Sequence, residues 1–187
     1  MKTLFYGDLH YGHENVIAYD GRPWASVEDM NGALVERWNA AVGKNDTVWF
    51  LGDLAMHVNA EGIRRLVGRL AGRKLLVKGN HDSRPDAFYR DCGFARVYDR
   101  PVLLMERFIL SHRPIDAAGS RFFNIHAHVH NHPDYPDASP WSRCVSACRT
   151  DYRPVEVEEF NEALAAWRGP GSAIPLRRSA TNGTALP

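Results

Sequence analysis

The chain has 187 residues, a length that suits one domain with a sizeable hydrophobic core. Its 23 basic and 22 acidic residues leave a net charge of +1, which excludes the strong positive field of a protein that wraps nucleic acid. No apolar run approaches the roughly 20 residues of a membrane span, and we expect no signal peptide because Asp8 interrupts the short apolar start. The three cysteines form no dense framework, so we expect a cytoplasmic protein.

In the first half of the chain, short apolar runs alternate with segments of helical spacing. Strands are predicted at residues 2–6, 47–51 and 74–78. A glycine-containing loop follows the first strand. Ser26 is the predicted N-cap of a helix that Gly43 ends. Asn59 is the predicted N-cap of a second helix, closed by Gly72. This β-α-β-α-β order is typical of a layered α/β domain.

The second half of the chain is richer in predicted strands, which fall at residues 94–98, 101–105, 107–110, 121–125 and 143–148. The proline-rich stretch 132–140 is predicted to be a loop, and a last helix is predicted over about 157–168. From Gly169 onward the composition shifts to Gly, Pro, Ser, Thr and Ala. We therefore predict one domain over residues 1–168 and a disordered tail over 169–187.

Five apolar runs of the chain each end in Asp, Asn or His. The endings are Gly7-Asp8-Leu9-His10, Gly52-Asp53, Gly79-Asn80-His81-Asp82, Ser111-His112 and Ala127-His128-Val129-His130. Open α/β folds usually build their sites at the edge where strands end, so we expect these side chains to gather there. Three of the endings begin with glycine, which permits a close approach of the backbone at the strand exit.

These residue types suit a pair of metal ions that act on a phosphate ester. Two divalent cations about 3.5–4 Å apart can bind phosphoryl oxygens and generate a hydroxide between them. Asp8 and His10 are two residues apart and can converge on one ion, while Asp53 is the natural bridge. Oxygen and imidazole ligands without thiolate suit Mn, Fe, Co, Ni or Zn better than Mg or Ca.

In this order, the five motifs resemble those of the calcineurin-like metallophosphoesterases, over residue 4 to about residue 160. Within that superfamily the chain is similar to the small phosphoesterases of bacteria and phages. The similar stretches are Phe5-Tyr6-Gly7-Asp8-Leu9-His10-Tyr11-Gly12-His13-Glu14-Asn15, Arg22-Pro23-Trp24 and Asp151-Tyr152-Arg153-Pro154-Val155. The resemblance implies a four-layer αββα sandwich, with two sheets face to face and helices outside.

The resemblance also implies roles for individual residues. One metal would take Asp8, His10, Asp53 and His130, and the other Asp53, Asn80, His112 and His128. His81 would not be a ligand but would stabilise the transition state or protonate the leaving oxygen, and Asp82 could orient it. The implied cofactor is a pair of divalent transition-metal ions, with Mn as the first choice and Fe, Zn, Co or Ni as alternatives.

The last motif departs from the family pattern, because Ala127 stands where the family has Gly. Histidines at 126, 128 and 130 allow a second register, in which His126 and His128 would be the ligands. That register would put Ile125 in the glycine position. Alanine is the milder change, so we favour His128 and His130 as ligands, with His126 beside the site.

Three residues near the motifs are candidate substrate contacts: Arg113, Arg22 and His13. Arg113 directly follows His112, and guanidinium groups match phosphate geometry. For either arginine the alternative is a surface salt bridge. His13 lies in the loop after the first motif, with simple loop packing as its alternative.

The predicted activity is hydrolysis of a phosphodiester, such as a nucleotide or cyclic nucleotide, by a metal-bridging hydroxide. Two alternatives remain: a phosphomonoesterase, and a catalytically silent metal-binding scaffold of the same fold. The expected partner is a small phosphoester, without a stable nucleic-acid complex and without a membrane. A nuclease that acts on polymer ends would need a basic lane leading to the site, which the near-neutral charge does not favour.

Overall fold

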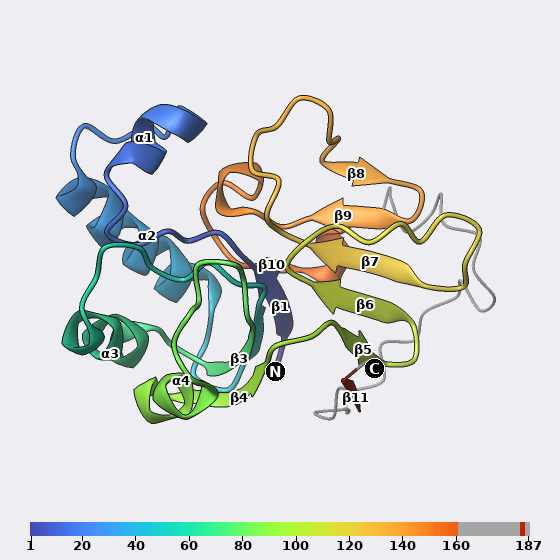
Figure 1. Cartoon of the computed structure of the whole chain (residues 1–187), viewed down its shortest axis with the longest axis horizontal. Helices are drawn as coiled ribbons and strands as arrows, with labels where there is room; N and C mark the ends of the chain where they lie inside the picture. The colour runs from blue at the N-terminus through green and yellow to red at the C-terminus, as the bar shows by residue number, and fades with distance from the viewer. Residues whose placement is uncertain (161–183, 186–187) are drawn as a thin grey trace.

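The computed structural model describes residues 1–160 and 184–185 of the chain. Two β-sheets lie face to face, and α-helices cover the outer face of one of them (Figure 1). This arrangement confirms the predicted α/β class with two packed sheets. No helix among the described residues is long and apolar enough to cross a membrane.

The first sheet has five strands in the order β10-β1-β2-β3-β4. Their bounds are Thr3–Tyr6 for β1, Thr47–Phe50 for β2, Arg73–Val77 for β3, Phe94–Tyr98 for β4 and Val155–Glu156 for β10. Strands β1 to β4 are parallel, and β10 pairs antiparallel with β1 at the edge. The carboxyl ends of β1, β2 and β3 therefore meet at one edge of the sheet, where the first three motifs begin.

Four α-helices pack on one face of this sheet: α1 (Asn15–Asp20), α2 (Val27–Ala41), α3 (Ala60–Arg69) and α4 (Asp86–Cys92). The two predicted N-caps are confirmed, because the Ser26 side chain accepts from the backbone N–H of Asp29, and Asn59 does the same from Gly62. Helices α1 and α4 were not predicted. Both end at a glycine in the left-handed conformation, Gly21 and Gly93.

Alternation along the strands divides the core into two layers. Tyr6 and Phe50 face the helices, where they contact the fully buried Trp38 of α2. Their chain neighbours Phe5 and Trp49 point the other way and pack between the two sheets. Because successive strand residues face opposite sides, the continuous apolar run of each strand serves both layers.

The second sheet has the order β11-β5-β6-β7-β9-β8. The bounds are Val102–Leu104 for β5, Phe108–Ser111 for β6, Phe123–His126 for β7, Ala138–Ser139 for β8, Ser142–Cys144 for β9 and Thr184–Ala185 for β11. Strands β6, β7 and β9 are parallel, so His112 and the 127–130 motif emerge at the same edge. Strand β8 lies in the predicted loop 132–140. The strand predicted over 143–148 is shorter, because Ala147–Arg149 forms the 3₁₀ helix η1.

The chain after β10 is described only as far as Phe160. The predicted helix over 157–168 begins there as the 3₁₀ helix η2 (Val157–Phe160), and its remainder lies outside the described residues. The predicted tail 169–187 also lies outside them, apart from β11. All four α-helices of the described residues lie on the first sheet, so the fourth layer of the αββα prediction has no α-helix among them.

Candidate metal centre

The five motifs meet where corresponding ends of the two sheets come together. Gly7, at the end of β1, forms a parallel bridge with Ser146, which follows β9 of the second sheet. Around this junction the ligand atoms form two groups, each within 4.8 Å: Asp8, His10 and His130, and Asp53, His112 and His128. The structure therefore brings together six of the seven predicted ligands in two clusters, and Asn80 contacts the second.

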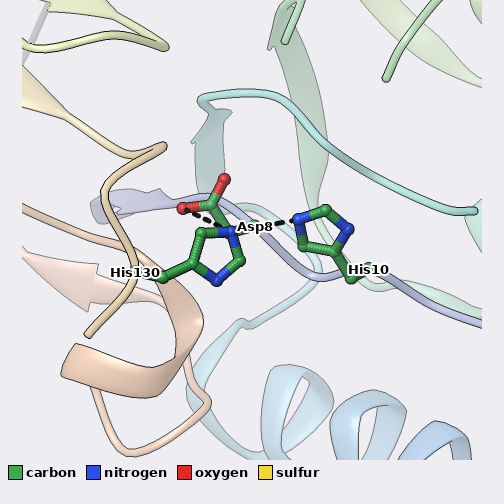
Figure 2. A group of neighbouring side chains, drawn as sticks. All are labelled: Asp8, His10 and His130. Atoms are coloured by element: carbon green, nitrogen blue, oxygen red, sulfur yellow. Dashed lines mark hydrogen bonds and ion pairs between the residues drawn. The ribbon is translucent and has the colours of Figure 1, made fainter. Parts of the chain in front are cut away.

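In the first cluster, the rings of His10 and His130 and the carboxylate of Asp8 point toward one another (Figure 2). The two Nε2 atoms are 3.2 Å apart, and His130 Nε2 lies 3.9 Å from Asp8 Oδ2. Asp8 Oδ2 accepts from the Ser146 hydroxyl and the His128 backbone N–H, whereas the buried Oδ1 has no hydrogen-bond partner. A buried carboxylate oxygen without a partner is costly, and a cation beside it removes that cost, so these residues fit a metal.

In the second cluster, three groups surround the Nε2 atom of His112. Asn80 Oδ1 lies at 3.0 Å, His128 Nδ1 at 3.1 Å and Asp53 Oδ2 at 3.4 Å. His112 Nδ1 lies 2.7 Å from the carbonyl oxygen of Leu51, which can only accept, so Nδ1 carries the proton. In the neutral ring, Nε2 is then left with a lone pair that faces the other three groups, as a metal ligand requires.

Asp53 joins the two clusters through a single oxygen. Its Oδ2 lies 3.6 Å from His10 Nε2 and 3.4 Å from His112 Nε2. Its Oδ1 accepts from the backbone N–H of His81 at 2.9 Å, which fixes the orientation of the carboxylate. A single oxygen between one imidazole of each cluster could contact two ions at once.

The histidines of the last motif show which register the structure supports. His128 and His130 belong to the clusters, whereas His126 does not and is buried, with Nδ1 directed to the carbonyl oxygen of Ala127. The methyl group of Ala127 packs against Gly7, where an added Cβ would lie only 2.5 Å away. Because Gly7 has no side chain, there is room for the methyl group of Ala127 at the position where the family has glycine.

Burial and neighbouring charges set the protonation of the clusters. Burial and the charge of His130 lower the pKa of His10 to about 3, and burial and the charge of His112 lower that of His128 to about 4. Burial alone would raise the pKa of Asp53, but the protonated ring of His112 outweighs it and holds this pKa at about 2. At neutral pH, His10 and His128 are neutral and Asp53 is ionised, the states that bind a cation. Burial raises the pKa of Asp8, and despite burial the nearby carboxylates raise those of His112 and His130, so a cation competes with protons at these three.

Five of the predicted ligands have a strained backbone. Their φ angles lie in the left-handed region, at 55° for Asp8, 50° for His10, 59° for Asp53, 72° for His128 and 45° for His130. This conformation costs a residue with a side chain about 1–2 kcal/mol. Two glycines relieve crowding here, because a Cβ on Gly79 would lie 2.2 Å from Asp53 Oδ1, and one on Gly52 would lie 2.8 Å from His112 Nδ1.

Asp20 contacts the first cluster, although it belongs to none of the five motifs. Both of its carboxylate oxygens lie within 3.0 Å of His130 Nδ1, which donates to them. Asp20 is the last residue of α1, a helix that was not predicted, and it lies 110 residues before its partner. A carboxylate on the far nitrogen of a metal-binding imidazole fixes the ring and raises its basicity.

The prediction that Arg22 contacts the substrate is contradicted by its burial. Its side chain has no exposed surface, and it donates to Asp20 and to the backbone carbonyl oxygens of Asp8 and Leu9 at 2.9–3.1 Å. Arg22 therefore supports the first motif from beneath and ties it to Asp20.

The predicted role of Asp82 also needs correction. Its buried carboxylate accepts from the backbone N–H groups of Asp53 at 2.7 Å, Gly79 at 2.9 Å and Leu54 at 3.2 Å. These bonds leave both oxygens engaged with the loops after β2 and β3. Asp82 therefore positions Asp53 and does not orient the ring of His81.

The remaining predicted residues lie at the rim of the centre. The His81 ring is about one-third exposed, and its Nε2 lies 3.9 Å from Asp53 Oδ2. Arg113 is exposed, with Nη1 2.8 Å from His128 Nε2. The ring of His13 lies 5.5 Å from that of His10 and 5.6 Å from that of His57.

A cavity of about 170 Å³ opens beside His81. Its lining includes His57, Ser83, Arg84 and Tyr89, together with apolar side chains from the loop after β2 and from α3. The rim residue His81 thus stands between the metal clusters and a hollow of mixed polarity.

Comparison with known proteins finds one matching family and several similar chains. The family model for calcineurin-like phosphoesterase matches residues 1–168. The chain is 35% identical over 164 residues to uncharacterized protein MJ1445 of Methanocaldococcus jannaschii, over 84% of the chain and 88% of that protein. It is 37% identical over 123 residues to the Gene 66 protein of Mycobacterium phage D29, over 63% of the chain and 59% of the phage protein.

Among solved structures, the protein of unknown function AQ665 from Aquifex aeolicus aligns with a TM-score of 0.64 and 25% identity, over 86% of this chain and 97% of that one. The family match spans nearly all of the described fold, and the ligand motifs lie within it. The chain belongs to the calcineurin-like phosphoesterase family.

Proposed function

We propose that the protein is a dinuclear metal-dependent phosphodiesterase. The observation that carries this proposal is the position of Asp53 Oδ2, within 3.6 Å of one imidazole nitrogen from each cluster. When bound, two divalent cations would supply charge that neutralises the phosphoryl oxygens and lowers the pKa of water. The donor set of carboxylate, amide and imidazole groups favours a transition metal, with manganese as our first choice.

The groups of the chain itself would divide the remaining work. His81 lies at the opening beside the bridging carboxylate, where it can give a proton to the leaving oxygen. Arg113 stands on the other side, next to His128, where its guanidinium can hold a phosphoryl oxygen. The buried Asp82 and Arg22 keep the ligand loops in place.

A diester suits the surroundings better than a monoester because it carries two ester groups that need room. The cavity beside His81 offers that room to the leaving or the retained group, with polar contacts from Ser83 and Arg84. A phosphomonoester has a leaving group but no retained ester group, so only one side of its phosphate needs such room.

The test compares bis-p-nitrophenyl phosphate with p-nitrophenyl phosphate. Protein stripped with a chelator is reloaded with Mn²⁺, Fe²⁺, Co²⁺, Ni²⁺ or Zn²⁺, and its metal content is measured alongside the rates. We expect metal-dependent hydrolysis with a higher kcat/KM on the diester. A higher value on the monoester would make the protein a phosphomonoesterase, and two bound ions without turnover of either ester would make it a silent scaffold.

A further inference from the structure

A second, larger groove adjoins the cavity that contains His81. Its volume is about 360 Å³, and its lining includes Tyr11, His57, Asn59, Arg65 and Arg69. His57 and Val58 line both this groove and the cavity that contains His81, so the two hollows meet there. A substrate that extends from the metal centre past His81 therefore reaches the groove at His57.

The groove presents two guanidinium groups and no carboxylate among its lining residues. Arg65 and Arg69 are exposed on α3, near its carboxyl end. Arg65 pairs with Glu61 at 3.5 Å, but both side chains are more than 60% exposed, so water and salt keep this pair weak. Arg69 makes no ion pair with any residue that the structure describes. Both cations are therefore available to an anionic ligand.

Charge is unevenly distributed along the chain. Residues 61–100, which hold most of α3 and all of α4, contain ten basic and five acidic residues. The rest of the chain holds 13 basic and 17 acidic residues, so the net charge of +1 conceals a strong asymmetry. Arg65 and Arg69 belong to this basic segment, and a local excess of positive charge raises the concentration of anions nearby.

The junction between the two hollows is rigid. The backbone N–H of Met56 donates to the carbonyl oxygen of Tyr11 at 3.0 Å, and Tyr11 and Ala55 form a parallel bridge. Val58 fills the space beside Gly12, where an added Cβ would lie 2.3 Å from Val58 Cγ2. These contacts hold the backbone on both sides of His57, whose own φ is 60°. A backbone that is already ordered loses little entropy on binding.

We propose that this groove is a second phosphate-binding subsite, and that the preferred substrate is a phosphodiester with at least one further phosphate group. Arg65 and Arg69 would bind the further phosphate, and His57 would contact the segment that links it to the scissile one. This inference rests on the proposed function, because it places the scissile phosphate at the metal centre.

The first test uses two p-nitrophenyl esters of thymidine 5′-phosphate, one with a free 3′-hydroxyl and one with a 3′-phosphate. Both release p-nitrophenolate, so they differ only in the second phosphate. The Mn²⁺-loaded full chain should prefer the 3′-phosphorylated ester by about tenfold or more in kcat/KM, the effect expected of charge-assisted hydrogen bonds. The double variant Arg65→Gln/Arg69→Gln should bring the ratio of the two kcat/KM values close to one.

Arg90→Gln is the matched control, because it removes the same charge from an exposed arginine of the basic segment that does not line the groove. This control should keep the wild-type ratio of the two kcat/KM values. Arg65, Arg69 and Arg90 are all exposed, so the variants should fold, and thermal unfolding verifies this. A ratio that the double variant leaves unchanged overturns the proposal, even if both rates fall.

A second readout does not depend on turnover. Calorimetry compares the binding of thymidine 3′,5′-bisphosphate and thymidine 5′-monophosphate to the wild type and the double variant. Tighter binding of the bisphosphate by about tenfold, lost in the double variant, supports the subsite even if no ester is hydrolysed and the proposed function fails. Equal affinities of the wild type for the two ligands overturn it.

The length of the bound oligonucleotide shows whether the further phosphate belongs to a nucleic-acid strand or to a small phosphorylated molecule. Affinities are measured for oligothymidylates of two to six nucleotides under the same salt conditions. Affinity that keeps rising with length identifies a nucleic-acid strand, whereas a plateau after one additional phosphate identifies a small phosphorylated substrate. Either result upholds the subsite, and affinity that does not rise at all contradicts it.

Discussion

The two ligand clusters share Asp53 but differ in how the protein supports them. In the first, Asp8 is fully buried and bonded to Ser146 and to a backbone N–H, and Asp20 holds the ring of His130. In the second, Asn80 is exposed and His128 is flanked by the exposed Arg113. We therefore expect the first cluster to hold its ion more firmly, and the second to leave its ion more open to a substrate.

The largest effect is expected from the residue that belongs to both clusters. Asp53→Asn removes the bridging charge, so both ions should be lost and hydrolysis of bis-p-nitrophenyl phosphate should fall to background. Metal content after gel filtration and the rate with excess Mn²⁺ check this. A variant that keeps one ion and substantial activity would show that a single metal suffices.

His81→Ala should keep both ions and lower kcat by about 10²-fold, because it removes a proton donor and no ligand. The loss should be greater on diphenyl phosphate than on bis-p-nitrophenyl phosphate, since the poorer leaving group needs the proton more. Metal loss in this variant would show that His81 is a ligand, and equal losses on the two esters would argue against proton donation.

Asp20→Asn should weaken the binding of one ion by roughly 10–100-fold and leave the other unchanged, because its carboxylate contacts His130 and Arg22, which both belong to or support the first cluster. Titration of the stripped protein with Mn²⁺ should then separate two affinities. Asp99→Asn, at an exposed site, is the matched control. An equal loss of affinity for both ions would remove the distinction between the clusters.

Arg113→Gln should have the smallest effect, a rise in KM of up to about tenfold with unchanged metal content, because the arginine is exposed and partly screened. The effect should shrink as salt is added. The exposed Arg121→Gln serves as control. If metal content fell with Arg113→Gln, the arginine would be supporting His128 and not the substrate.

Much of the centre could be predicted because each ligand directly follows an apolar run. Such runs identify strands, and parallel strands bring their ends to one edge, so Asp8, Asp53 and Asn80 could be placed together from sequence alone. The N-caps Ser26 and Asn59 were also readable, since capping is a local property.

Contacts between distant stretches could not be predicted in the same way. Asp20 and Ser146 lie 110 and 138 residues from the ligands they bond, and neither belongs to a motif. The burial of Arg22 depends on the packing of α1, a short helix marked only by Gly21 at its end. The basic groove was hidden for a related reason, because net charge averages over faces that only the fold separates.

The left-handed backbone at five candidate ligands has a consequence for the history of such a domain. Together these residues burden the metal-free fold with several kcal/mol, at about 1 kcal/mol or more apiece. Replacing any of them with glycine abolishes a ligand and relaxes the chain at the same position. A homologue that is no longer selected for catalysis would gain folding stability by losing these ligands. Catalytically inactive members are therefore an easy evolutionary outcome for this fold.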